Sequence, residues 1–392
     1  MSHIHHLPEE IMHDILSRLP VQSLSQCRFV SKDWYNFVMN PTLVNLHHSR
    51  INKRDLGNSF LVLCQSDRHG HRSKLYLLDN GNYNTSNNVR TSLNPLKIKF
   101  DRVTLIIELV GSSNGFICLN TCPYDGEFYI CNPITRDKLM LPRAPSLYKE
   151  GGIWFPSSYG FAFDATTNTH KVVSAWYFAD KDNISRIQTV ITIYNLASGT
   201  WKLIEEDIPC EIVPTYTLLP TCQVFVNGSL HWEISLKNSV WEEDRCIGAI
   251  NIADEKFRSF RKPPMDLDNR VLKLRTLSSL REHLCVIDEF NDCMVIWIMK
   301  CYGVEESWTR ELNIRKEMIG SLQTVSFQTL RTMKNGSILI PGYECQGYYD
   351  IEKKEFKHIL INKLQSRPNG LQPVVHVGSL ISVREHQYPI RK

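Results

Sequence analysis

The chain has 392 residues, of which 42% are hydrophobic and 22% are charged. These fractions are ordinary for a globular protein and exclude a disordered, collagen-like or coiled-coil chain. The net charge of +4 is too small to indicate nucleic acid as a partner. Residues 1–20 include three acidic side chains and no long apolar run, so we expect no secretory signal. The longest apolar run, residues 294–299, is too short to span a membrane.

The twelve cysteines are spread from Cys27 to Cys345, and most of them lie inside apolar runs. No Cys-x-x-Cys pair occurs, whereas a zinc site built on cysteines needs tight pairs. We therefore expect free, buried thiols in a reducing compartment, which means the cytoplasm, the nucleus or both. We also expect no metal site and no cofactor.

Residues 7–48 have the apolar spacing of helices and predict three short ones. Apolar residues recur every four positions along the first helix and form one stripe: Ile11, Ile15 and Leu19. Pro20 ends that helix, a second is expected over residues 23–28, and a third begins after an N-cap at Ser31 and ends at Asn40-Pro41. A unit this small buries little surface, yet its apolar side chains exceed what its own core needs. We therefore expect an exposed apolar face that binds another protein.

Residues 58–385 are rich in β-branched and aromatic residues, in short runs that Gly, Asn, Asp and Pro interrupt. Tight turns followed by an apolar strand recur at intervals of 54 to 59 residues: Asn114-Gly115, Asn168-Thr169, Asn227-Gly228, Arg281-Glu282 and Asn335-Gly336. Asn-Gly supplies the positive backbone dihedrals of a tight hairpin. A second marker, a strand, a polar turn and another strand, recurs within each period, as in YICNPITRDKLML and IYNLASGTWKLI.

This period predicts an all-β, kelch-like propeller with six blades, and seven blades are the alternative. Two stacked β-sandwiches would explain the strand content, but they would not explain the regular spacing of the turns. The last strand, around Leu380 to Val383, is expected to close the ring by pairing with the first blade. The predicted domains are a helical domain over residues 1–48, a linker over 49–57, a propeller over 58–385 and a tail over 386–392.

No catalytic motif was found: the chain has no G-x-S-x-G, no P-loop and no G-x-G-x-x-G. Trp201, Trp232, Trp297 and Trp308 fall at strand positions of the repeat, where packing between blades explains them. We therefore expect no enzyme, and instead a recognition surface built from loops at one end of the propeller.

The segment LPEEIMHDILSRLPVQSLSQCRFVSKDWYNFVMNP resembles an F-box motif, because it contains LP, IL, RLP, SL, R, VSK and W in that order. Phe29 departs from this pattern, since many members have a small or charged residue there. The remainder resembles the F-box-associated, kelch-like region of plant F-box proteins, in SNGFICL, YICNPITR, YGFAFD, VNGSLHW and VGSLISV. The resemblance implies a non-catalytic substrate receptor of a Skp–cullin–F-box ubiquitin ligase. The helical domain would bind a Skp-type adaptor and through it the cullin and RING subunits, and the propeller would hold a target protein for ubiquitination and degradation.

By position in this motif, ten residues are predicted to contact the adaptor: Leu7, Pro8, Ile11, Ile15, Leu19, Pro20, Leu24, Cys27, Val30 and Trp34. For the target, we expect the polar insert 80–94 and the stretch 147–158 to matter, with Trp154 and Phe155 as the contact residues. Two other functions remain open: an interaction scaffold of kelch type that acts outside ubiquitination, and an enzyme with copper or another cofactor at the centre of the ring.

Overall fold

The computed structural model describes residues 7–53, 59–66, 73–79, 89–92, 94–96, 98, 107–121, 127–144, 152–180, 187–204, 210–212, 221–222, 224–236, 245–265, 271–315, 317, 331–332, 337–340, 346–362 and 371–384. Within these ranges, the side chains at some strand ends are not described, and those of Trp154 and Phe155 are among them.

Four helices open the chain: α1 (Glu9–Leu16), α2 (Val21–Cys27), α3 (Lys32–Val38) and α4 (Pro41–Lys53). The three predicted helices are confirmed, and so is the N-cap of α3, where Ser31 Oγ accepts a hydrogen bond from the Trp34 amide at 3.2 Å. The fourth helix was not predicted. Asn40 Oδ1 accepts from the Thr42 amide at 2.9 Å, and Pro41 opens α4, so Asn40-Pro41 starts a helix as well as ending one. The prediction of a linker is therefore wrong for residues 49–53, and residues 54–57 lie outside the described part.

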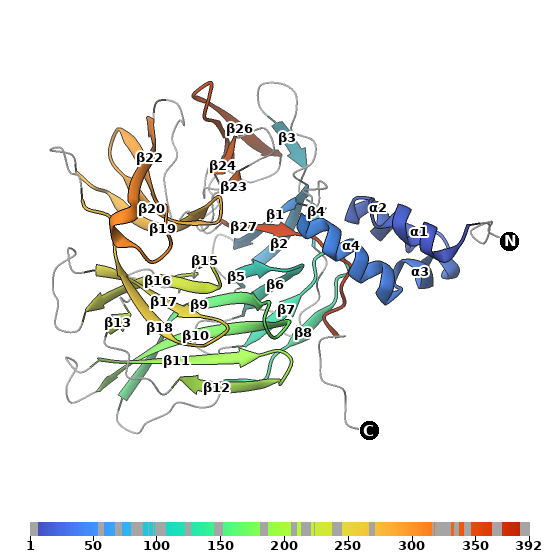
Figure 1. Cartoon of the computed structure of the whole chain (residues 1–392), viewed down its shortest axis with the longest axis horizontal. Helices are drawn as coiled ribbons and strands as arrows, with labels where there is room; N and C mark the ends of the chain where they lie inside the picture. The colour runs from blue at the N-terminus through green and yellow to red at the C-terminus, as the bar shows by residue number, and fades with distance from the viewer. Residues whose placement is uncertain are drawn as a thin grey trace.

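The strands that the structure describes form six sheets, which Figure 1 shows beside the helices. The first contains β1 (Ser59–Ser66), β2 (Ser73–Asp79), β4 (Asn94–Pro95) and β27 (Leu371–Val377). The second contains β5 (Glu108–Ser113), β6 (Phe116–Asn120), β7 (Phe128–Cys131) and β8 (Lys138–Met140). The third contains β9 (Gly152–Asp164), β10 (Thr169–Asp180), β11 (Ile187–Asn195), β12 (Thr200–Ile204) and β14 (Thr221–Cys222).

The fourth sheet contains β13 (Cys210–Ile212), β15 (Val224–Val226), β16 (Ser229–Leu236), β17 (Arg245–Asn251) and β18 (Phe257–Arg261). The fifth contains β19 (Leu274–Leu280), β20 (His283–Glu289), β21 (Cys293–Met299) and β22 (Trp308–Arg315). The sixth contains β3 (Val89–Ser92), β23 (Arg331–Thr332), β24 (Ile338–Ile340), β25 (Gln346–Asp350) and β26 (Glu355–Asn362). A short 3-10 helix, Glu305–Ser307, precedes β22.

The order of contacts between sheets follows a ring. β27 contacts β5, β5 contacts β9, β9 contacts β15, β15 contacts β19, and β19 contacts β23. The first sheet joins the two ends of the propeller segment, because β1 pairs antiparallel with β27 and places Phe60 opposite His376. A second link runs across the same junction, where β3 pairs parallel with β26 of the sixth sheet. These contacts are those of a β-propeller whose ring is closed by strands from both ends.

The prediction that residues 380–383 close the ring is wrong. The closing strand is β27, and residues 378–383 contain no strand. Leu380, Ile381 and Val383 belong to a short apolar, β-branched run of the kind found in strands, but their side chains are buried in a cluster that includes the helical domain. A short apolar run indicates burial, but it does not by itself identify a strand, and here the burial comes from packing in the shared cluster rather than from sheet pairing.

The predicted tight turns are confirmed where the structure describes them. Positive φ angles occur at Asn114, Gly115, Asn168, Asn227, Gly228, Arg281 and Glu282. The turn at Asn335-Gly336 lies outside the described residues. A second set of turns follows the third strand of several sheets: the side chains of Asn132, Asn195, Asn251 and Asp350 each accept hydrogen bonds from the amides two and three residues ahead.

The tight turns lie at the end of the propeller that meets the helices. His170 beside the β9–β10 turn bonds the Ser113 carbonyl beside the β5–β6 turn at 3.2 Å, so these two turns lie together. His48 of α4 bonds Asn114 Oδ1 in the β5–β6 turn at 2.7 Å. Figure 1 shows the β9–β10 and β11–β12 turns pointing towards the side that carries the helices. The opposite ends of the strands therefore face away from the helical domain.

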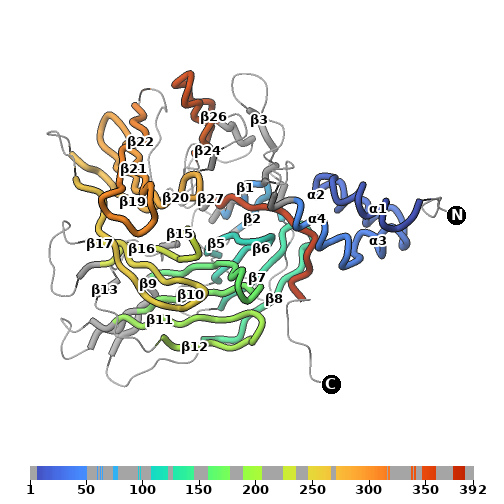
Figure 2. Tube along the Cα trace, viewed as in Figure 1, coloured from blue at the N-terminus to red at the C-terminus, as the bar shows by residue number. Residues whose placement is uncertain are grey.

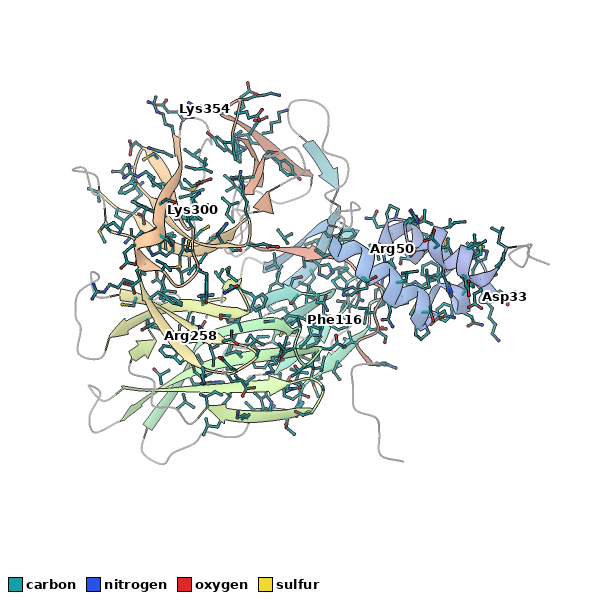
Figure 3. The ribbon with its side chains drawn as sticks, in the orientation of Figure 1. Asp33, Arg50, Phe116, Arg258, Lys300 and Lys354 are labelled. Carbon is teal, nitrogen blue, oxygen red and sulfur yellow. The ribbon has the colours of Figure 1, made fainter. Side chains whose placement is uncertain are left out.

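One cluster of buried apolar side chains is shared by the two domains. The helical domain contributes Leu16, Val21, Leu24, Val38, Leu43 and Val44, and the propeller contributes residues that include Phe60, Phe116, Phe128, Ile134, Leu380, Ile381 and Val383. Figure 3 shows side chains filling the space from the helices to Phe116 in the second sheet. The helical domain is thus packed on the propeller, and its position relative to the sheets is set by a common core.

Candidate functional site

An exposed apolar surface lies on the helical domain. Of the eleven large hydrophobic side chains that are exposed among the described residues, six lie between residues 7 and 35: Leu7 at 48%, Ile11 at 47%, Ile15 at 46%, Phe29 at 80%, Val30 at 66% and Tyr35 at 49%. The other five are distributed over the much longer propeller segment. We call these six residues the apolar surface. Such a concentration on a short helical unit marks a site for another protein.

The sequence of α1 explains how this surface forms. Ile11 and Ile15 are four residues apart and lie on one side of the helix, exposed. His13 and Leu16 lie on the other side and are buried. Because α1 has apolar side chains on both sides, one side packs on the core and the other remains open to solvent.

Asp14 holds α1 in place against α4. Its carboxylate accepts hydrogen bonds from Arg18 at 3.0 Å and from Arg50 of α4 at 2.5 Å. Arg50 also donates to the Asp14 carbonyl at 2.8 Å and to Ser17 Oγ at 2.5 Å. The hydrogen bonds from Arg50 and then Arg18 lower the pKa of Asp14 below its usual value, so the carboxylate stays charged at neutral pH. Figure 3 places Arg50 on the helix nearest the propeller, and the network fixes the direction in which Ile11 and Ile15 point.

The ten predicted adaptor contacts divide into three groups by exposure. Six are exposed: Leu7, Pro8, Ile11, Ile15, Pro20 and Val30. Three are partly buried and pack against the shared core: Leu19, Cys27 and Trp34. Leu24 is fully buried in that core, at 0% exposure, and is removed from the surface that a partner could reach.

The correction for Leu24 has a physical reason. Leu24 and Val21 of α2 face the propeller, and both are fully buried. The spacing of apolar residues in α2 identifies a packed side, but it does not tell whether the packing partner is another protein or the rest of the chain. Phe29 and Tyr35 were not among the predicted contacts. Each is a large apolar residue outside the buried positions of its segment, and that signal could have identified them.

Two polar contacts join the helical domain to the turns of the second sheet. Arg28 Nη2 donates to the Ile134 carbonyl at 3.2 Å, and His48 bonds Asn114 at 2.7 Å. Within the helical domain, buried His47 bonds the Leu19 carbonyl at 2.9 Å through Nε2. Burial lowers the pKa of His47, and it is therefore neutral at physiological pH. These contacts place the apolar surface at a defined position relative to the propeller.

The predicted target residues lie at the far end of the third sheet. Trp154 and Phe155 belong to β9, opposite Phe178 and Tyr177 of β10. They come before Ser158, whereas the turn after β9 begins beyond Asp164, at the end that meets the helices. Their side chains lie outside the described residues, so their exposure is not tested.

Among the described residues, no group of three His, Cys, Asp or Glu side chains is arranged to hold a metal ion. In that same part of the chain, no helix has both the length and the apolar character needed to span a membrane. The eight cysteines whose side chains the structure describes are free thiols. What the helical domain presents among its described residues is an exposed apolar surface.

Comparison with known proteins gives two family matches. The F-box domain model matches residues 4–45, and the F-box associated beta propeller domain model matches residues 68–383. F-box protein At3g07870 of Arabidopsis thaliana is 27% identical, over 95% of this chain and 91% of its own length. F-box protein CPR1 of the same plant is 26% identical, over 96% of this chain and 88% of its own. The F-box/kelch-repeat protein At3g23880 is 24% identical, over 79% of this chain and 80% of its own.

Proposed function

Because the chain belongs to the plant F-box proteins with an F-box associated β-propeller domain, we propose that it is the substrate-recognition subunit of a Skp–cullin–F-box ubiquitin ligase. The F-box binds a Skp-type adaptor, and through the adaptor it is joined to the cullin and RING subunits. The propeller, which we infer to be kelch-like with one blade for each of the six sheets, binds the target protein. The chain itself supplies no catalytic residue, since ubiquitin transfer takes place on the partner subunits.

The observation that carries this proposal is the apolar surface of the F-box. Ile11 and Ile15 leave about half of their side-chain area open although the core of the domain lies directly behind them. Burying such a side chain fully in a partner contributes about 1.5–3 kcal/mol. A few anchors of this kind are enough for a stable complex when they fill pockets on the other protein.

The test of adaptor binding is a pull-down with a purified Skp-type adaptor. We expect the unmodified chain to bind, and we expect the double variants Leu7→Ala/Pro8→Ala and Ile11→Glu/Ile15→Glu to lose binding. Each buried anchor lost costs about 2 kcal/mol or more, which weakens the complex about thirtyfold. Val271→Glu is the matched control, because Val271 is an exposed apolar residue of the propeller, at 69%. Failure of the unmodified chain to bind any Skp-type adaptor would overturn the proposal.

The test of the ligase function is proximity labelling in plant cells under proteasome inhibition. The unmodified chain and its Ile11→Glu/Ile15→Glu variant should label the same target, because the propeller is unchanged. Only the unmodified chain should lower the amount of that target when the proteasome is active. If the variant lowers it equally, the protein acts as an interaction scaffold outside ubiquitination.

The target is expected at the end of the propeller that faces away from the F-box. In the second, third and fourth sheets, the connections between the second and third strands lie at that end and are longer than the tight turns beside the F-box. Loops on a rigid scaffold are where recognition residues concentrate. Trp154 and Phe155 lie at that distal end and remain our proposed target contacts.

A further inference from the structure

We propose that residues 378–383, which follow the ring-closing strand, form a strap that fixes the orientation of the F-box relative to the propeller. Figure 2 shows this segment, in red, passing between the helices and the second sheet. The strap would fix this orientation whatever the protein binds. The further consequence, that the strap holds the adaptor and the target at a constant distance, rests on the proposed function.

The strap begins where three elements meet. At Gly378, an added Cβ would lie 2.6 Å from Phe60 Cε2, 3.0 Å from Val21 Cγ1 and 3.1 Å from Ile134 Cγ1. These atoms belong to the first strand of the propeller, to helix α2 of the F-box and to the β7–β8 turn. The backbone at Gly378 is therefore in close contact with the closing sheet, the F-box and the second sheet at once, and there is no room for a side chain.

Asn132 ties the strap to the second sheet. Its Nδ2 donates to the carbonyl oxygens of Ser379 at 3.0 Å and Ile381 at 2.7 Å. Its Oδ1 accepts from the amides of Ile134 at 2.8 Å and Thr135 at 3.2 Å, which shapes the β7–β8 turn. Asn132 is fully buried. Removing the strap would leave the two donors of a buried amide group without these acceptors, which is costly.

The apolar side chains of the strap are buried in the same core as those of the F-box. Leu380 is 1% exposed and Val383 is 0% exposed, and both belong to the core cluster that contains Val21 and Leu24 of α2. On the other side, Ser379 crosses the β5–β6 turn so closely that a Cβ at Gly115 would overlap its hydroxyl oxygen. The strap thus occupies the space between the F-box and the turns of the second sheet, where it contributes atoms to the packing on both sides.

A single substitution can disconnect the strap without changing the turn. In Asn132→Asp, one carboxylate oxygen can still accept from the amides of the turn. The other oxygen replaces the Nδ2 donor, so an acceptor then faces the carbonyl oxygens of Ser379 and Ile381. Asp350 shows that an aspartate supports this turn, because its Oδ1 accepts from the amides of Glu352 and Lys353 at 3.1 Å each. Asn195→Asp is the matched control, since Asn195 shapes the same turn in the third sheet, where it bonds Ala197 and Ser198.

The experiment measures the distance between the F-box and the propeller in the full chain. Spin labels are attached through an introduced bio-orthogonal amino acid at two exposed positions, Glu10 of α1 and Arg258 of β18, so that the native cysteines remain unlabelled. Double electron–electron resonance should give one narrow distance distribution for the unmodified chain and for Asn195→Asp. It should give a broad distribution for Asn132→Asp and for Gly378→Ala, whose added Cβ pushes the strap out of its position.

Folding is checked by tryptophan fluorescence of the propeller, and a truncation pair provides a second route if a substitution prevents folding. A chain that ends at Arg384 keeps the strap and should retain the narrow distribution, whereas a chain that ends at Val377 should lose it. A narrow, unchanged distribution in the folded Asn132→Asp variant or in the chain ending at Val377 would overturn the proposal. Because no adaptor is present in this measurement, its failure is distinguishable from a failure of the ligase function.

Discussion

Arg28 of the F-box donates a hydrogen bond to the carbonyl oxygen of Ile134 in the propeller, across 3.2 Å. The same guanidinium donates to Ser25 Oγ at 2.8 Å and to the Ser25 carbonyl at 3.2 Å, so its position is fixed by its own helix before it reaches the propeller. Burial lowers the pKa of Arg28 below its ordinary value, because the guanidinium cation loses part of its hydration when it is buried. This residue belongs to the F-box motif, and in this chain it also serves the contact between domains.

We expect Arg28→Ala to lower the free energy of unfolding by about 1.5–3 kcal/mol, the range for hydrogen bonds that involve a charged group. Arg18→Ala is the control, because Arg18 lies just beyond the end of α1, is exposed and pairs with Asp14 of that helix, so the loss should stay below about 1 kcal/mol. Urea unfolding followed by tryptophan fluorescence measures both. Equal losses in the two variants would show that the contact with Ile134 contributes little.

The two sides of the F-box should respond to substitution in opposite ways. Leu24→Ala empties a fully buried position in the shared core, and we expect it to lower the free energy of unfolding by about 2–5 kcal/mol. Ile15→Ala removes a side chain that is 46% exposed, and we expect a change within about 0.5 kcal/mol together with weaker adaptor binding. Thermal unfolding and a binding titration on both variants make the comparison. A stability loss for Ile15→Ala as large as that for Leu24→Ala would contradict the assignment of the two sides.

The parts of the fold that the sequence predicts are those that depend on neighbouring residues. Asn114-Gly115 and Asn227-Gly228 adopt positive φ because these residues tolerate it at little cost, and this preference is visible without knowledge of the rest of the chain. The first three helices follow from spacing and from the cap at Ser31 for the same reason. Helix α4 is harder, because Asn40-Pro41 fits the end of one helix as well as the start of another.

The parts that the sequence does not predict depend on contacts between distant segments. Leu24 is buried because it lies in a core that the F-box shares with the propeller and with residues 380–383, and nothing in α2 itself signals that packing. Ile15 is exposed because the shared core lies on the other side of α1. The same long-range packing buries the apolar run at residues 380–383 although it forms no strand. The apolar surface could therefore be located on the F-box from its sequence, but its individual members could not all be identified.

A buried cation joins the third and fourth sheets. Lys171 is 4% exposed at its side chain, and its Nζ lies 3.3 Å from Asp164 Oδ2 and 3.1 Å from Glu255 Oε1. Burial alone would raise the pKa of Asp164, but hydrogen bonds from Thr166, Thr167 and Lys171 outweigh it and lower that pKa to about 2. Burial would also raise the pKa of Glu255, but hydrogen bonds from Lys202 and Lys171 outweigh it and lower that pKa, so both carboxylates are charged at neutral pH.

We expect Lys171→Met to lower the free energy of unfolding by about 3–5 kcal/mol, because it leaves the buried carboxylate of Asp164 without its cation. Lys202→Met is the matched control. Lys202 pairs with Glu255 at 2.6 Å but is 67% exposed, so its removal should cost at most about 1 kcal/mol. Chemical denaturation of the two variants separates them, and a loss for Lys171→Met no greater than that for Lys202→Met would refute the role of the buried pair.

Two glycines of the tight turns differ in their surroundings, which makes them a matched pair. Both have positive φ, at 91° for Gly115 and 71° for Gly228, so alanine is strained at either position. An added Cβ at Gly228 meets only Asn251 Nδ2 at 3.7 Å, whereas at Gly115 it overlaps Ser379. We expect Gly228→Ala to cost about 1 kcal/mol and Gly115→Ala clearly more. Melting temperatures of the two variants test this order, and the reverse order would argue against the tight crossing of residue 379 over the turn.

Buried histidines make the stability depend on pH. Burial lowers the pKa of His376 to about 3, and it lowers that of His231 to about 4 against the weaker opposing effect of hydrogen bonds to backbone carbonyls. In the unfolded chain a histidine has a pKa of about 6.5. Above about pH 6.5 these histidines are neutral in both the folded and the unfolded chain, so they make no contribution to the pH dependence of stability. As the pH falls below it, the unfolded chain takes up protons that the folded chain does not, so each histidine destabilises the fold by about 1.4 kcal/mol per pH unit until its own folded pKa is reached.

Glu108 acts in the opposite direction, because burial raises its pKa to about 7 and the folded chain holds that proton more tightly than the unfolded chain. The His376→Asn variant isolates one histidine from this background. Asn can retain a hydrogen bond to Ser112 Oγ, which lies 2.9 Å from Nδ1 of the histidine, but it does not titrate. Urea unfolding of both proteins between about pH 7 and about pH 5 should show that the variant loses less stability on acidification, by about 1.4 kcal/mol per pH unit below pH 6.5. Parallel pH profiles for the variant and the unmodified chain would mean that His376 is protonated in the folded protein as readily as in the unfolded one.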